Sequence, residues 1–143
     1  MTSDEIRAFV RRYVDLTQHE NLRELVECYD ERARVESPMF HTIQGRADIE
    51  KSYRDLFRAF DEWDFKIDDI LVDQETGDRA ALVYTVQATH RGDLFGMPGT
   101  GRRAEVRGVY VLSFENGRIV SERRLYDFTG LLVQLGVLKA RAV

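Results

Sequence analysis

The sequence predicts an α+β fold, a cone-shaped, curved antiparallel sheet wrapped around N-terminal helices. Apolar residues recur at helical spacing through roughly the first sixty positions, and after Trp63 the period changes to the alternation typical of strands. An Asn116-Gly117 pair, which is favoured in tight hairpins, separates the last two expected strands. Helices followed by long antiparallel strands are typical of α+β proteins, and the open end of such a barrel can hold a ligand.

Three helices are expected in the N-terminal part of the chain. Ser3 or Asp4 would cap the first helix, whose apolar stripe consists of Ile6, Phe9, Val10, Tyr13, Val14 and Leu16. The second, shorter helix has an apolar side made of Leu22, Leu25, Val26 and Tyr29. A short strand at 34–37 follows. Gly45 then introduces a third helix, with apolar positions Ile49, Tyr53, Leu56, Phe57 and Phe60.

The rest of the chain is expected to form a meander of strands and a final helix. The strands are predicted near residues 65–72, 80–89, 102–114 and 118–126. Turns at Glu75–Asp78 and at Asn116-Gly117 join the first pair and the last pair. A short apolar helix begins near Phe128, and Gly136 ends it.

Length and composition limit the kind of protein this can be. The 143 residues fit one domain, 1–143, and the 43% hydrophobic and 32% charged content is typical of soluble globular chains. The net charge of -4 argues against nucleic acid as a partner, because such binding relies on neutralising phosphates. The three histidines are scattered, so no metal site is expected.

The same composition predicts a cytoplasmic location and no membrane association. No apolar run approaches the ~20 residues of a membrane-spanning helix. The N-terminus lacks the basic and apolar segments of a secretory signal. The single cysteine, Cys28, cannot form an internal disulfide, which fits a reducing compartment. Its place on the apolar side of a helical pattern indicates core packing.

Two segments carry a resemblance to a known family. The stretch Thr89–Arg102, THRGDLFGMPGTGR, and the tail that contains Asn116–Val120, Tyr126-Asp127 and Leu131–Gly136 resemble the SnoaL-like polyketide cyclases. That family belongs to the nuclear transport factor 2-like superfamily, which includes ketosteroid isomerase and limonene epoxide hydrolase. The resemblance spans the chain in length and element order, and it implies a cystatin-like α+β barrel with a ligand pocket. Fold alone does not fix the reaction in this group.

Asp127 is the candidate general base. It follows the last expected strand among apolar neighbours, where a carboxylate would resist ionisation and have a raised pKa. The resemblance implies that it removes a proton next to a carbonyl in an intramolecular aldol closure, without a metal or cofactor. The alternative is that Asp127 caps the terminal helix through the amides of Thr129 and Gly130. Both roles can coexist.

The enolate formed by such a base needs hydrogen-bond donors in a dry site. Tyr13 on the first helix corresponds to the oxyanion tyrosine of ketosteroid isomerase, and Tyr110 on the long third strand falls near that enzyme's second oxyanion acid. Both are catalytic candidates, and the alternative for each is a core aromatic with a satisfied hydroxyl. Ser37 stands where the isomerase has its base, so steroid-type isomerisation is not expected.

Arg123 is the residue that most affects the cyclase interpretation. Strand alternation from Asp127 places Arg123 on the same face, together with Ser121 and Leu125. An arginine there would lower the pKa of Asp127 or bind a substrate carboxylate. The alternative is an arginine on an outward face. Limonene-type hydrolysis lacks its Arg-x-Asp pair, because the corresponding strand reads Thr85-Val86-Gln87.

Five further side chains are expected to line the pocket. His41 and His90 are candidates for its mouth, where an imidazole can donate a hydrogen bond or a proton near neutral pH. Phe9, Phe57 and Trp63 are candidates for its apolar wall. A hydrogen-bonded structural histidine and a core aromatic are the respective alternatives.

Three functions remain open from the sequence. The first is a cofactor-independent cyclase that acts on an apolar carbonyl compound, the second is a non-catalytic protein that binds an apolar small molecule, and the third is water addition with Asp127 as the activating base. A homodimer is also expected, because an open curved sheet leaves an outer face to cover. The alternating Arg107, Val109 and Val111 would contribute to that face.

Overall fold

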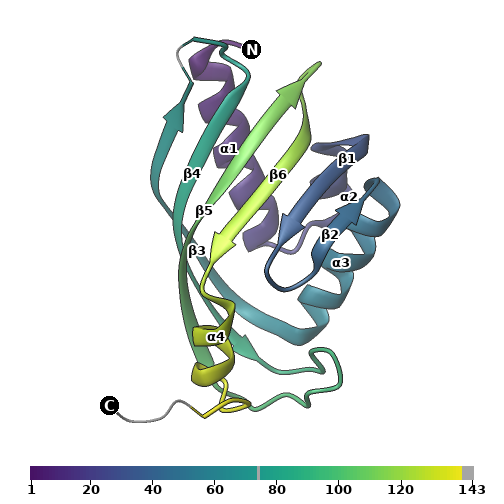
Figure 1. The fold of residues 1–143 in the computed structure, drawn as a ribbon, viewed down its shortest axis with the longest axis vertical. Helices are drawn as coiled ribbons and strands as arrows, with labels where there is room; N and C mark the ends of the chain where they lie inside the picture. The colour runs from purple at the N-terminus through teal and green to yellow at the C-terminus, as the bar shows by residue number, and fades with distance from the viewer. Residues whose placement is uncertain (74, 140–143) are drawn as a thin grey trace.

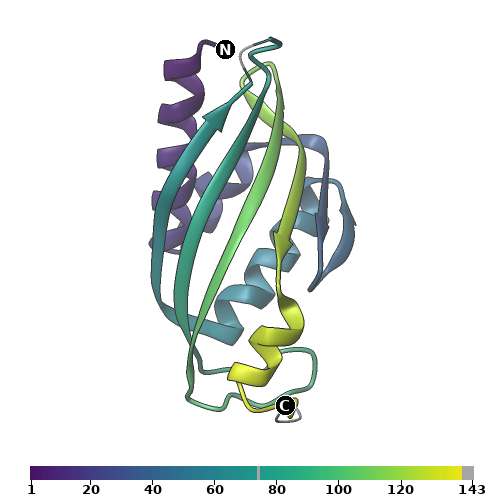
Figure 2. The same cartoon turned by 60° about the vertical axis from the view of Figure 1, so that its left-hand side comes forward.

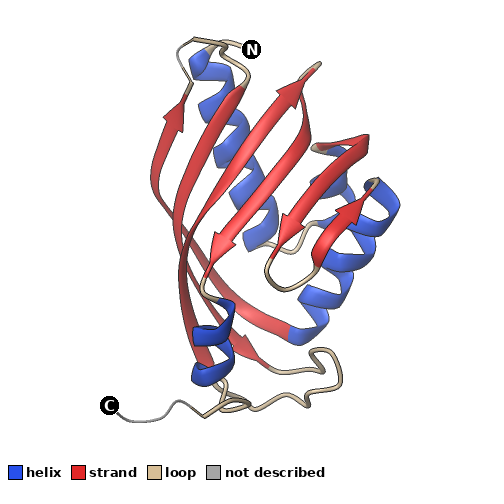
Figure 3. Ribbon diagram, viewed as in Figure 1, coloured by secondary structure: helices blue, strands red, loops and turns tan. Residues whose placement is uncertain are grey.

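The computed structural model describes residues 1–73 and 75–139. The elements, in chain order, are α1 (Ser3–Gln18), α2 (Leu22–Glu27), β1 (Tyr29–Ser37), β2 (His41–Gln44), α3 (Arg46–Ala59), β3 (Phe60–Val72), β4 (Arg79–His90), β5 (Arg103–Glu115), β6 (Arg118–Tyr126) and α4 (Phe128–Gln134). They form the expected α+β architecture, a six-stranded curved sheet that does not close into a full barrel (Figures 1 and 3).

The sheet has the strand order β2-β1-β6-β5-β4-β3. Strands β3 to β6 form the predicted antiparallel meander. Strand β1 pairs with β2 in antiparallel orientation, but it pairs with β6 in parallel, which the prediction of an antiparallel sheet did not include. Strand β2 was not predicted, and β1 begins at Tyr29, a residue assigned in the prediction to the second helix.

The N-terminal helices cover one face of this sheet. In Figure 2 the long strands are in front, α3 lies behind them, and α1 lies along their left-hand side next to β3. Helix α1 packs against β3, and its buried stripe is Ile6, Val10, Tyr13, Val14, Leu16 and Thr17. Its N-cap is Thr2 rather than Ser3 or Asp4, because the Thr2 and Glu5 side chains form a capping box. None of the helices in the described residues is long and apolar enough to cross a membrane.

The buried side chains form two hydrophobic clusters. The larger cluster lies between α1, α2, α3 and the sheet, and it includes Ile6, Leu25, Ile49, Leu82 and Leu112. The smaller cluster gathers around α4 and the end of β4, and it includes Leu131 and Leu135. Phe40, Leu56 and Val106 pack at the edge of both clusters. The candidate site lies at this junction.

A bulge in β6 decides which side chains face the helices. Phe114 on β5 pairs with Ile119 and Ser113 pairs with Ser121, so Val120 is an extra residue without a partner. One extra residue reverses the alternation of every later side chain in the strand. Beyond the bulge, Glu122 and Arg124 therefore point inward.

Candidate ligand-binding site

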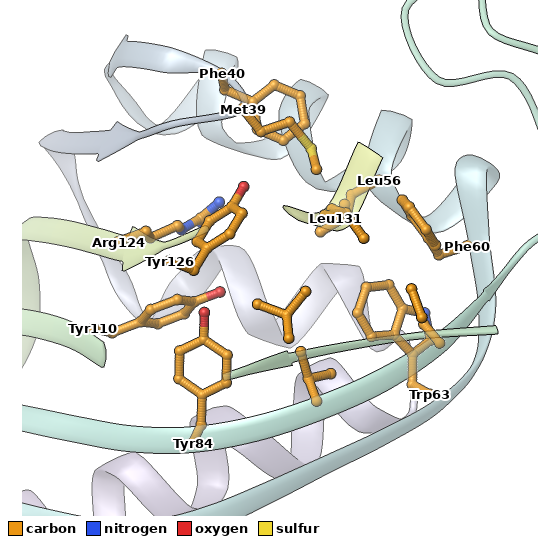
Figure 4. Close-up of a pocket in the computed structure, with 14 residues that line it drawn as sticks. Met39, Phe40, Leu56, Phe60, Trp63, Tyr84, Tyr110, Arg124, Tyr126 and Leu131 are labelled. Atoms are coloured by element: carbon orange, nitrogen blue, oxygen red, sulfur yellow. The ribbon is translucent and has the colours of Figure 1, made fainter. Parts of the chain in front are cut away.

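A cavity of about 80 Å³ lies between the two hydrophobic clusters. Its apolar side consists of Met39, Phe40, Leu56, Phe60, Trp63 and Leu131 (Figure 4). Its floor is the sheet, where Val86 is the direct cross-strand partner of Val106 and Ala88 is the partner of Ala104. The two alanines leave space above β4 and β5 that larger side chains would fill.

The opposite wall of the cavity is polar. It consists of Tyr84 on β4, Tyr110 on β5, and Arg124 and Tyr126 on β6. Tyr110 is the direct cross-strand partner of both Leu82 and Arg124. Figure 4 shows these four side chains grouped on one side of the cavity, with the phenol oxygens of Tyr84 and Tyr110 close to one another.

Arg124 forms a buried ion pair with Glu122. The Arg124 Nε atom lies 2.7 Å from Glu122 Oε2, and the side chains of Arg124 and Glu122 are 5% and 0% exposed. The Arg124 Nη2 atom donates a further hydrogen bond of 3.1 Å to the Tyr53 hydroxyl. The guanidinium also lies over the rings of Tyr53 and Tyr110, at 5.2 and 5.4 Å from their centroids.

Three tyrosines from different elements complete the network behind Arg124. Glu122 Oε1 accepts hydrogen bonds from Tyr13 at 3.0 Å and from Tyr29 at 2.8 Å. The Tyr53 hydroxyl bonds to those of Tyr29 and Tyr13, at 2.6 and 2.9 Å. The network thus links α1, β1, α3 and β6, and it fixes the guanidinium at the polar wall of the cavity.

The electrostatics keep this network in one protonation state at neutral pH. Burial raises the pKa of Tyr13 and Tyr29 well above the usual value, and the nearby carboxylate of Glu122 raises both further. Burial alone would lower the pKa of Arg124, but Tyr53 and Glu122 raise it well above its ordinary value. The phenols are therefore neutral donors, and Arg124 is a charged one.

Asp127 lies outside this cavity lining. Its side chain is exposed, and its Oδ1 accepts a hydrogen bond of 2.8 Å from the amide of Gly130 as the N-cap of α4. Of the two amides named in the capping alternative, that of Gly130 bonds to Asp127 in the structure. Asp127 follows the cavity residue Tyr126 directly, and Leu131 of the helix that it caps lines the cavity.

The two candidate tyrosines occupy different positions. Tyr110 lines the cavity beside Arg124. Tyr13 is 1% exposed, and its hydroxyl is used in the network with Glu122 behind the cavity. Their rings meet edge to face at 6.3 Å. Tyr110, unlike Tyr13, lies in the cavity wall, where its hydroxyl can donate a hydrogen bond to an oxygen atom of a bound ligand.

The other candidate residues divide in the same way. Trp63 lines the cavity, and Phe57 packs on the Trp63 ring at 5.9 Å without being among the cavity residues. Phe9 packs on Phe114 in the larger cluster. Arg123 is exposed on the outer face of the sheet, and its Nε lies 3.8 Å from Glu36 Oε2. It therefore has the outward position that was predicted from the sequence as the alternative to a place in the pocket.

The histidines do not line the cavity. His41 is exposed at the start of β2. His90 is fully buried, and its Nδ1 accepts a hydrogen bond of 3.3 Å from the backbone amide of Thr100. This bond closes the hairpin loop that carries the family resemblance. A Cβ at Gly99 in the same loop would overlap the carbonyl oxygen of Arg91, so the loop requires glycine there.

Sequence reasoning missed Glu122, Arg124, Tyr84 and Tyr126 as site residues. The signal that points to them is the pairing of Tyr110, already a candidate, with Arg124 across the β5–β6 hairpin. That pairing depends on the bulge at Val120. Within the described residues, no group of His, Cys, Asp and Glu side chains has an arrangement that could hold a metal ion.

A family model for the SnoaL-like polyketide cyclases matches residues 7–135, which includes every element that builds the cavity. The chain belongs to the SnoaL-like polyketide cyclase family. Among solved structures it is similar to AclR, a proposed hydroxylase from Streptomyces galilaeus, with 25% identity, a TM-score of 0.83, and coverage of 99% of this chain and 87% of that one.

Two other solved structures share the fold at lower identity. TsrD from Streptomyces laurentii has 22% identity and a TM-score of 0.83, with 96% of this SnoaL-like chain and 99% of TsrD covered. An LEH-like epoxide hydrolase of M. tuberculosis has 21% identity and a TM-score of 0.72, with 95% of each chain covered. No curated protein matches this chain.

Proposed function

We propose that the protein binds an apolar carbonyl compound in the cavity and polarises its oxygen through Arg124. The observation that supports this is a buried guanidinium in the polar wall of a cavity whose other side is apolar. Arginine has five N–H donors, and the described hydrogen bonds of Arg124 use its Nε and one on Nη2. Nη1 is left to donate to a ligand, beside the neutral phenol of Tyr110.

This arrangement suits the redox-neutral chemistry of the family. In an aldol closure a base removes the proton next to a carbonyl, and the resulting enolate carbon bonds to a second carbonyl carbon. The oxygen of that second carbonyl then takes up a proton, and the base is restored. Preorganised donors in a dry site stabilise the negative charge that develops on oxygen. Arg124 and Tyr110 would supply these donors, and the reaction as written needs no redox cofactor.

Binding can be measured with the protein's own fluorescence, because Trp63 is the single tryptophan and it lines the cavity. We expect acetophenone, a small aromatic ketone, to change this fluorescence saturably. The double variant Glu122→Gln/Arg124→Met removes both charges together and should weaken binding by at least about tenfold through the lost charge-assisted hydrogen bond. Arg123→Met, on the outer face, should leave affinity unchanged. Equal affinities in all three proteins would contradict the proposal.

A second candidate role concerns Asp127 as the base, and the family match together with its place next to Tyr126 favours it. We expect Asp127→Asn to abolish protein-catalysed exchange of the acetophenone methyl protons in D₂O, followed by NMR. Asparagine caps helices about as well as aspartate, so the stability of this variant should be nearly unchanged.

Asp127→Ala is the matched control, because it shows how much the N-cap of α4 contributes to stability. It removes the acceptor of the Gly130 amide and should cost about 0.5–2 kcal/mol of stability. Exchange that continues in Asp127→Asn at the wild-type rate would reduce Asp127 to its capping role. The protein would then be a non-catalytic protein that binds an apolar small molecule, which is the second of the three functions left open by the sequence.

We further propose a homodimer formed through the outer face of the sheet. Two cross-strand rows on that face each have one charged member, Arg123 in one row and Asp69 in the other. Their six apolar members are Leu71, Ala81, Val83, Val109, Val111 and Leu125. Leu71 and Leu125 are 55% and 51% exposed, and burying such side chains favours association. A reducing compartment such as the cytoplasm is also proposed, because the single cysteine, Cys28, cannot form an internal disulfide.

A further inference from the structure

The positive charge in the cavity wall, that of Arg124, is neutralised by Glu122, which lies outside the lining. Arg124 is the single charged side chain among the described cavity residues, and Glu122 pairs with it at 2.7 Å from outside the lining. We propose that Glu122 determines the charge preference of the site, so that the cavity selects uncharged carbonyl compounds over carboxylates of the same shape. This inference rests on the proposed function, because it names the class of ligand for that same cavity.

Glu122 is held as a permanent partner of the guanidinium. It is fully buried, and its two oxygens receive hydrogen bonds from Arg124, Tyr13 and Tyr29. These contacts satisfy a carboxylate, which accepts hydrogen bonds and donates none. The tyrosines remain neutral, so the buried cluster carries one positive and one negative charge and no net charge.

The neutral Arg124–Glu122 pair affects a ketone ligand and a carboxylate ligand differently. A ketone oxygen can accept a hydrogen bond from Nη1 of Arg124 without adding charge to the interior. A carboxylate would bring a second negative charge to a guanidinium that Glu122 has already neutralised. The described cavity lining offers no second cation to compensate it, and burying an unpaired charge is costly. The cavity therefore disfavours an anion even though arginine forms its polar end.

Three aromatic probes of nearly equal size test this charge preference in the unmodified protein. Acetophenone and benzamide are neutral at neutral pH, whereas benzoate is an anion. Titrations followed by Trp63 fluorescence should give similar affinities for the two neutral probes. Benzoate should bind at least about tenfold more weakly, because like charges brought together in an interface are strongly disfavoured.

A charge-changing variant gives the opposite expectation. Glu122→Gln keeps the shape of the side chain and leaves Arg124 as a net positive charge, so the preference should reverse in favour of benzoate. Tyr13→Phe is the matched control, because it removes one hydrogen bond to Glu122 without changing its charge. The control should keep the wild-type preference, which separates the effect of charge from that of a disturbed network.

The outcomes distinguish this inference from the proposed function. Benzoate binding to the wild type as tightly as acetophenone, or more tightly, would overturn the inference while the proposed function stands. If none of the three probes binds, both fall. If Glu122→Gln does not fold, the wild-type comparison of benzamide with benzoate still decides the matter.

Discussion

Replacing Arg124 by methionine is expected to lower the free energy of unfolding by about 3–5 kcal/mol. The variant keeps most of the side-chain volume but leaves Glu122 as a buried carboxylate without its 2.7 Å partner. Removing one member of a buried ion pair is among the most destabilising single changes, because the remaining charge has lost both water and partner. The loss would be measured by urea denaturation at neutral pH. It is a large share of the total stability of a typical small domain.

The neighbouring arginine provides the control for this result. Arg123 lies 3.8 Å from Glu36, with both side chains about half exposed, and surface pairs of this kind contribute less than about 1 kcal/mol. Arg123→Met should therefore unfold close to the wild-type urea concentration. Adding Glu122→Gln to Arg124→Met should restore much of the lost stability, because no unpaired charge remains. Similar losses for Arg123→Met and Arg124→Met would show that the ion pair does not have the stabilising role described above.

The second large effect is expected at alkaline pH, where the native protein should resist tyrosine ionisation and then unfold. Burial is the first cause that raises the pKa of each of the six tyrosines. For Tyr53 the pKa rises from 10.0 to about 12. A raised pKa in the folded state stabilises the protein fully below the unfolded value, and this stabilisation is lost as pH increases through the folded value.

For Tyr53 alone this contribution is about 2–3 kcal/mol, and the loss occurs between pH 10.0 and about 12. The other five tyrosines act in the same direction. We therefore expect the phenolate absorbance to rise together with the loss of near-ultraviolet circular dichroism, in a single steep transition. Tyrosines that ionise with an ordinary pKa while the circular dichroism stays native would contradict the buried network.

Much of the fold follows from local patterns in the chain. The amphipathic stripe of α1 and the Asn116-Gly117 turn predicted elements that the structure confirms, because helical periodicity and tight turns are properties of short segments. Strand β2 was missed since it has four residues, of which one, Ile43, is buried. The parallel pairing of β1 with β6 joins segments far apart in sequence, for which the chain offers no local signal.

The site was predictable only in part, and the bulge at Val120 explains why. Simple alternation along β6 places Arg123 and Asp127 on one face and assigns Arg124 to the other. The structure keeps this alternation, but the shared face of Arg123 and Asp127 is the exposed one. Because of the unpaired Val120, the inward positions run from Ile119 to Glu122 and Arg124, so the arginine in the cavity is Arg124. Tyr110 was predicted from the resemblance and Trp63 as part of the apolar wall, and neither prediction depends on the register of β6. Glu122 and Arg124 read as surface residues in a sequence, since their burial depends on the pairing that neutralises them.

A crystal structure of the acetophenone complex would show whether Arg124 holds the oxygen of a carbonyl ligand inside the cavity. We expect the ketone oxygen within hydrogen-bond distance of the Arg124 guanidinium, with the ring between Trp63 and the floor formed by Ala88 and Ala104. A ketone bound outside the cavity, or inside it with its oxygen directed at the apolar wall, would show that Arg124 does not hold the ligand oxygen.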